Sequence, residues 1–91
     1  MATNFTNRKA SQTLAGQAAL VTLNSSDAAN MYLLRAGQLC TNQSSGKTGT
    51  VNKINVYGNS FTISPIQPNM NFSSASVYGY LASGEVVSVN T

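Results

Sequence analysis

The sequence contains no histidine, no tryptophan and one cysteine, Cys40. A single cysteine excludes an intrachain disulfide, and a chain without histidine lacks the usual ligands of a structural zinc site. Charged residues make up only 8% of the chain, against about 25% in ordinary soluble domains. The two acids, Asp27 and Glu85, are too few for a paired-carboxylate active site or a dedicated site for a divalent metal. We therefore expect no enzyme activity, no metal and no cofactor.

The positive net charge of +3 reflects scarce acids rather than a basic patch. Among the cations only Arg8 and Lys9 are adjacent, whereas nucleic-acid binding needs several clustered phosphate contacts. We therefore do not expect a nucleic-acid partner. No apolar run approaches the roughly 18 residues of a membrane span, and no apolar segment follows the first positive charges as in a secretory signal. We expect synthesis in a cytoplasm, a reduced Cys40 and no membrane partner.

Two alternating runs meet within residues 51–66 and predict a β-hairpin. With Gly58 and Asn59 as a two-residue loop, the four large apolar residues of the two runs share one face. These residues are Ile54, Val56, Phe61 and Ile63. The break in alternation near residues 52–53 predicts a β-bulge.

Short apolar runs separated by turn residues predict further strands over residues 18–23, 31–35, 38–42, 77–81 and 85–90, the last two as a second hairpin. A one-turn helix capped by Ser25 or Ser26 is a further expectation. The fold class is therefore all-β: a small antiparallel barrel or sandwich of about five to seven short strands. The inward-facing residues should be Val21, Leu23, Leu33, Leu39, Ile54, Val56, Phe61, Ile63, Leu81, Val87 and Val89.

The first 17 residues are polar, with scattered apolar side chains. They are expected to form an extended N-terminal arm, and residues 18–91 a single small β domain. In one interpretation the arm is frayed. In the other it lies on a neighbouring subunit, with Phe5 and Leu14 as anchors and Arg8 and Lys9 as charge contacts. Deleting residues 1–17 should then leave the β domain folded and weaken assembly.

Three tyrosines, Tyr57, Tyr78 and Tyr80, could line an exposed aromatic strip. Tyr78 and Tyr80 are two residues apart and share a face of a strand, while Tyr57 lies on the polar side of the first hairpin. Such a strip could stack on sugar rings. The alternative is that these side chains cover a subunit interface or the edge of the core.

The polar arm over residues 2–17, the turn-containing pieces 36–39 and 81–86, and the hairpin over residues 50–64 resemble those of small structural proteins of tailed-bacteriophage virions. The closest type is the capsid decoration or cement protein. The resemblance implies a β-barrel or sandwich that binds over junctions of the major capsid protein or other virion subunits. It also implies a homo-oligomer, with a trimer favoured, located in the virion.

A different class of function stays open at this point. The chain could be a β module of a tail fibre or adhesin that recognises host-surface glycan through the three tyrosines. It could also be a tail or baseplate subunit that stacks in rings, which sequence reasoning does not separate from a decoration protein. A small domain without disulfide or metal needs support from oligomerisation or from a partner under each of these interpretations.

Overall fold

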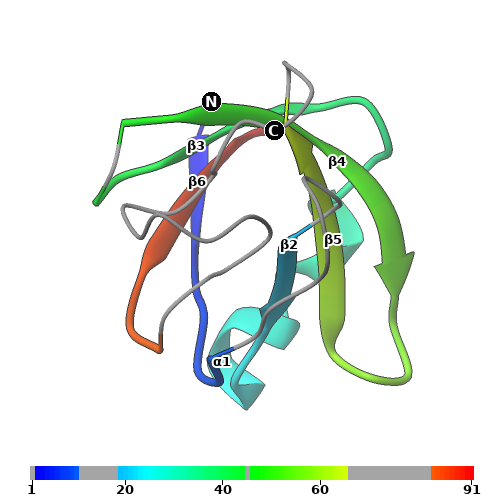
Figure 1. Ribbon diagram of the computed structural model, residues 1–91. Helices are drawn as coiled ribbons and strands as arrows, with labels where there is room; N and C mark the ends of the chain where they lie inside the picture. Colours follow the sequence, from blue (N-terminus) through cyan, green and yellow to red (C-terminus); the bar gives the residue numbers. More distant parts are fainter. Residues whose placement is uncertain (1, 11–18, 45, 66–82) are drawn as a thin grey trace.

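The computed structural model of the protein describes residues 2–10, 19–44, 46–65 and 83–91. Within these ranges six strands form one antiparallel sheet in the order β1-β6-β3-β4-β5-β2 (Figure 1). The strands are β1 (Ala2–Thr6), β2 (Ala19–Thr22), β3 (Leu39–Asn42), β4 (Thr48–Asn55), β5 (Ser60–Pro65) and β6 (Val86–Asn90). Helical structure in the described ranges is confined to α1 (Ser25–Ala28) and the 3-10 turn η1 (Met31–Leu33). The predicted all-β class and the number of short strands are confirmed.

The sheet curls around its core without closing. Phe5 on β1 packs edge-on against Phe61 on β5, with ring centroids 5.4 Å apart and planes at 74°. These strands are first and fifth in the sheet order, so the contact requires the sheet to bend back on itself. At one end the two edge strands are bridged, because the Arg8 amide donates to the Thr22 carbonyl (2.9 Å) and Asn7 Oδ1 accepts from the Thr22 amide (3.0 Å).

All six strands contribute to one hydrophobic core. The buried apolar residues are Phe5, Val21, Leu23, Met31, Leu34, Cys40, Val51, Phe61, Ile63, Val87 and Val89. Ile54 packs against this cluster from its edge. Burying a large apolar side chain stabilises a fold by about 1.5–3 kcal/mol. The core explains how a chain with no disulfide holds a defined sheet.

The N-terminal segment is part of the β domain, which corrects the predicted arm. β1 pairs with β6 along its whole length, from Ala2 opposite Asn90 to Thr6 opposite Val86. Phe5 lies on the inner face of β1 and is 0% exposed. The expected boundary at residue 17 is therefore wrong for residues 2–6, while residues 11–17 lie outside the described ranges. Phe5 is the one large apolar residue of β1, so the sequence shows no alternation of apolar and polar residues that would have indicated this strand.

The β4–β5 hairpin is confirmed, but its predicted register is wrong. Asn55 lies opposite Ser60 and Ile54 opposite Phe61, so the loop has four residues instead of two. The bulge is confirmed, because the register shifts between Val51 and Ile54. Together the longer loop and the bulge keep Ile54 and Phe61 on the same face while moving Val56 out of the strand.

The predicted strand over residues 31–35 is wrong, since this segment contains η1. Residues three apart in a 3-10 helix lie on the same side, and Met31 and Leu34 are accordingly buried while Leu33 is only half-buried. The predicted helical turn is present as α1, but its cap is Asn24, whose side chain accepts a hydrogen bond from the Asp27 amide at 2.9 Å.

Strand β3 presents the opposite face from the one predicted. Cys40 is buried, whereas Leu39 is 46% exposed. The pairing of β3 with both β4 and β6 sets this orientation, with Cys40 opposite Gly49 on one side and Val89 on the other.

Strand β6 lies between β1 and β3 and is paired along both edges. The last strand of the predicted second hairpin is therefore present as β6. Residues 77–81, including the predicted core residue Leu81, lie outside the described ranges.

Candidate interaction surface

The end of the β4–β5 hairpin is held in a defined conformation by its own polar groups. The Asn55 side-chain oxygen accepts from the Gly58 amide at 3.1 Å, and the Asn59 amide donates to the Val56 carbonyl at 3.3 Å. Asn59 has φ of 51°, a left-handed conformation that asparagine tolerates better than most residues. The Leu23 amide donates to the Asn59 carbonyl at 2.8 Å. This last bond ties the loop to the segment that follows β2.

Two apolar side chains project from this loop. Val56 is 63% exposed and Tyr57 is 102% exposed, as exposed as in a free chain. Val56 was expected in the core, and its exposure follows from the four-residue loop, which releases it from the alternation of the strand. Surface hydrophobic residues scattered singly are normal, but two adjacent ones on a constrained loop form a candidate contact point.

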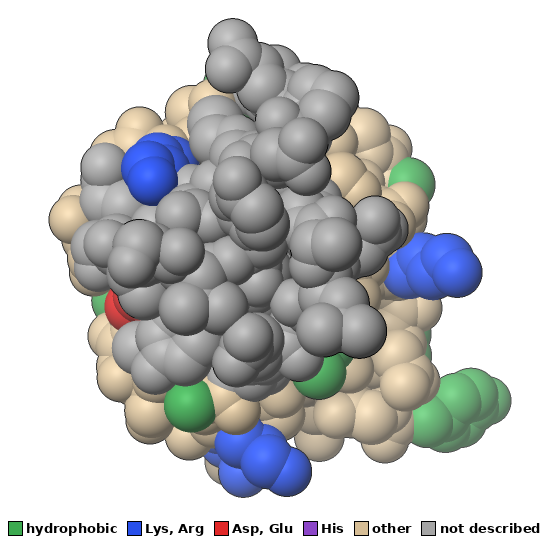
Figure 2. Space-filling model, viewed as in Figure 1, with side chains coloured by type: hydrophobic (Ala, Val, Ile, Leu, Met, Phe, Trp, Pro, Cys, Tyr) green, Lys and Arg blue, Asp and Glu red, His purple; other side chains and the backbone are tan. Residues whose placement is uncertain are grey.

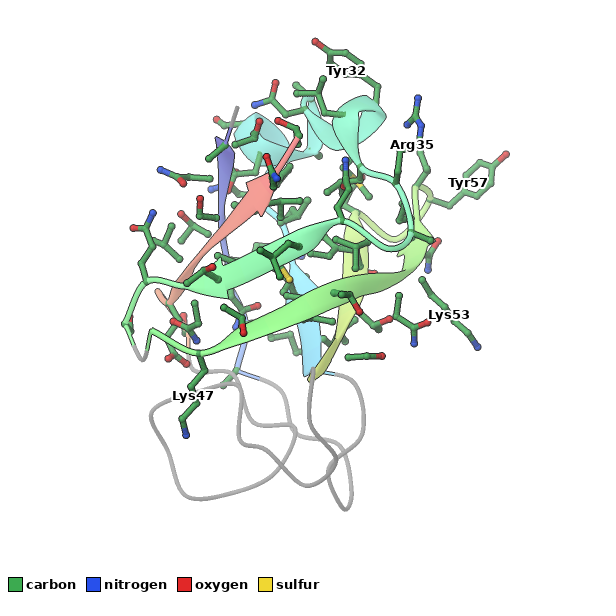
Figure 3. The ribbon with its side chains drawn as sticks, turned by 90° about the horizontal axis from the view of Figure 1, so that it is seen from above. Tyr32, Arg35, Lys47, Lys53 and Tyr57 are labelled. Atoms are coloured by element: carbon green, nitrogen blue, oxygen red, sulfur yellow. The ribbon has the colours of Figure 1, made fainter. Side chains whose placement is uncertain are left out.

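Lys53 extends this surface along β4. It lies in the bulge, where its amide donates to the Thr62 hydroxyl at 3.0 Å, and its side chain is exposed. Figure 3 shows Lys53 and Tyr57 pointing away from the sheet on the same side of the molecule, while Lys47 lies at the opposite end of β4. We refer to Lys53, Val56 and Tyr57 together as the hairpin-end surface.

A second exposed group follows the helical segment. Tyr32 is 71% exposed on η1, and Arg35 Nη1 donates to the carbonyls of Tyr32 (2.9 Å) and Leu34 (2.8 Å). These two bonds anchor the guanidinium beside its own backbone. Sequence reasoning missed this pair because it interpreted residues 31–35 as a strand. The sequence signal available was the spacing of Met31 and Leu34, which fits a helical turn.

Among the predicted arm contacts that the structure describes, Phe5 is separated from the two exposed cations. Phe5 is inside the core, so it is not available to a partner while the sheet is intact. Arg8 Nε donates to the Leu23 carbonyl at 3.0 Å, and Lys9 is exposed. Leu14 lies outside the described residues.

Of the predicted tyrosine strip, Tyr57 belongs to the described residues. This side chain is exposed at the hairpin end. Tyr78 and Tyr80 both lie outside the described residues. The strip therefore stays a prediction, of which one member is placed at the surface.

The residues that could bear chemistry are dispersed. Asp27 Oδ2 accepts from the Thr6 amide at 2.7 Å, and the buried Glu85 Oε1 accepts from Asn42 Nδ2 at 3.2 Å. In the described part of the chain, no group of three or more His, Cys, Asp or Glu residues could hold a metal ion. The two carboxylates instead bond to other parts of their own chain, where they organise local structure.

Burial raises the pKa of the Cys40 thiol from 9.0 to about 12, while a hydrogen bond with the Gly49 backbone acts weakly in the opposite direction. Desolvation disfavours the thiolate, which is the nucleophilic form of cysteine. Cys40 therefore acts as a small apolar core residue near neutral pH.

Alkaline pH is expected to destabilise the fold through Cys40. Between pH 9 and about 12 the unfolded chain loses the thiol proton while the folded chain keeps it. The unfolded state then binds fewer protons, so the free energy of unfolding falls as pH rises, by at most roughly 4 kcal/mol. Urea unfolding at pH 8.5, 10 and 11 should show a steeper loss for the natural chain than for Cys40→Ala. Parallel losses in the two proteins would contradict this role of Cys40, since all their other residues are the same.

The two helical pieces in the described ranges have four and three residues, so neither could cross a bilayer. Comparison with known proteins found no matching family model, no similar curated protein and no similar solved structure.

Proposed function

We propose that this chain is a non-enzymatic structural protein that binds an assembled virion shell, in the manner of a capsid decoration protein. The observation that carries the proposal is the hairpin-end surface, where a constrained loop holds Val56 and Tyr57 in solvent. Tyrosine is enriched among the residues that dominate protein–protein binding. A loop already held in one conformation loses little entropy when it docks.

The mechanism of such a protein is linkage between binding and assembly. A ligand that binds the assembled shell but not its free subunits stabilises the shell by mass action. The partners would be the major capsid protein or other virion subunits, and the location would be the virion. Few charges on the chain also mean little repulsion between neighbouring copies, which is compatible with a homo-oligomer such as a trimer.

Mass spectrometry of density-purified particles from the cells that make this chain tests the proposal. We expect the chain in the particle fraction, and we expect particles that lack it to disassemble at a lower temperature. Absence of the chain from the particles would contradict the proposal. Sedimentation velocity of the purified chain over a concentration series separates a trimer from a monomer.

Glycan binding is the second candidate, and the full exposure of Tyr57 favours it. Asn55 at the end of β4 and Asn59 in the loop are both exposed and lie two residues from Tyr57 in the sequence. An exposed aromatic face beside amide donors and acceptors can pair stacking with hydrogen bonds. A sugar array probed with the natural chain and with Tyr57→Ala distinguishes this candidate, because only glycan recognition predicts a signal that the substitution removes.

A further inference from the structure

The charged side chains that are exposed at the surface of this protein are all positive. All seven charged residues lie in the described ranges, and four of the five cations are exposed: Arg8, Lys9, Arg35 and Lys53. Neither of the two acids is fully exposed. Glu85 is 7% exposed and accepts from Asn42, and the half-buried Asp27 accepts from the Thr6 amide. A docking partner therefore meets cations and amides but almost no carboxylate.

At the hairpin-end surface this charge is next to the exposed apolar residues. Lys53 lies three residues before Val56, the first residue of the loop that also presents Tyr57, and its ammonium group has no ion pair among the residues that the structure describes. Figure 2 shows a hydrophobic side chain protruding at the lower right, where the β4–β5 hairpin of Figure 1 ends. The surface thus combines a protruding aromatic ring, an aliphatic group and one cation.

We infer that the hairpin-end surface docks into an acid-rimmed pocket on a partner protein, with Tyr57 filling the pocket and Lys53 facing its carboxylates. This inference rests on the proposed function and names the chemistry of the surface that receives the chain. Complementary charge steers association and sets register, while a buried tyrosine supplies most of the contact energy.

A protein surface fits these features better than a nucleic acid. Apart from the adjacent Arg8 and Lys9, the cations are separated from one another, as Arg35, Lys47 and Lys53 are in Figure 3. Tracking a phosphate backbone requires several cations in one stripe. A second copy of this chain is a poorer occupant, because it would bring its own exposed cations and few accessible carboxylates to the same surface.

The test uses density-purified particles stripped of the chain in about 1 M NaCl, where screening limits charge attraction to roughly 3 Å. Re-binding of the full-length chain is measured by co-sedimentation at several lower salt concentrations. The variants are Tyr57→Ala, Lys53→Ala and Lys53→Glu. The matched controls are Tyr32→Ala, which removes an exposed tyrosine outside the hairpin, and Lys9→Ala, which removes a cation elsewhere. All five substitutions replace exposed side chains, and circular dichroism confirms their folding.

We expect Tyr57→Ala to weaken binding at least about tenfold. Lys53→Ala should weaken it a few-fold and flatten the salt dependence, and Lys53→Glu should bind more weakly than Lys53→Ala. The two controls should bind like the natural chain.

Three results would overturn the inference. If the natural chain binds and the hairpin variants bind equally well, the docking surface lies elsewhere and the proposed function stands. If the natural chain fails to bind the stripped particles, both the inference and the proposed function fall. If a single-stranded DNA oligonucleotide binds with the same dependence on Tyr57 and Lys53, the partner is a nucleic acid.

Discussion

Replacing Phe5 with alanine is expected to lower the free energy of unfolding by about 3–5 kcal/mol, the range for a buried aromatic truncated to alanine. Phe5 is fully buried and packs edge-on against Phe61, so the substitution leaves a cavity between β1 and β5. Since small domains have a total stability of about 5–15 kcal/mol, the loss would leave a large unfolded fraction at moderate temperature. Urea denaturation followed by circular dichroism measures it.

Lys9→Ala is the matched control, because it changes an exposed residue in the same N-terminal segment. Its effect should stay within about 0.5 kcal/mol. A loss below about 1 kcal/mol for Phe5→Ala would contradict the placement of β1 in the sheet. It would instead support the prediction that the N-terminal segment is an extended arm. The sequence predicts that a chain without residues 1–17 keeps its β signal, and the structure predicts that it loses the edge strand and one side of the core.

The second large effect is expected at a buried polar position. Asn42 on β3 is fully buried, its Oδ1 accepts from the Ser44 amide at 2.9 Å, and its Nδ2 donates to Glu85 at 3.2 Å. Asn42→Leu keeps the volume but removes both bonds, so a buried carboxylate and a partly buried amide each lose a partner. The free energy of unfolding should fall by about 2–4 kcal/mol.

Gln43→Leu provides the control, because Gln43 is the next residue and its side chain makes an exposed hydrogen bond to Asn4 Oδ1. Its effect should be within about 0.5 kcal/mol. The double variant Asn42→Leu with Glu85→Leu should lose less than the sum of the two single variants, because the two side chains interact directly. Additive losses would show that the bond between Asn42 and Glu85 contributes nothing to stability.

Much of the fold could be predicted from the local alternation of apolar and polar residues along the chain. The alternation around Ile54, Phe61 and Ile63 predicted the hairpin and its apolar face, and the break in that alternation located the bulge. Val21, Leu23, Val87 and Val89 were also correctly placed in the core. Each of these residues belongs to a run of several apolar side chains, where the period of two is visible.

The wrong predictions of inward-facing residues concern segments in which the run of apolar residues is too short to show an alternation. Cys40 and Leu39 are adjacent and both apolar, so the inward residue was decided by the strands that flank β3. Val56 left the core because hydrogen bonds of Asn55 and Asn59 lengthened the loop. At the candidate surface, the exposure of Tyr57 fits its predicted place on the polar side of the hairpin.

The sequence by itself determined the all-β class, the central hairpin with its bulge, and a surface with few charges, because composition and side-chain period are local properties of a chain. Only the tertiary structure decided that β1 completes the sheet, that Phe5 meets Phe61, and that both acids are engaged by their own chain. Those outcomes depend on contacts between residues more than 20 positions apart, and such contacts form only when the sheet curls and brings distant strands together.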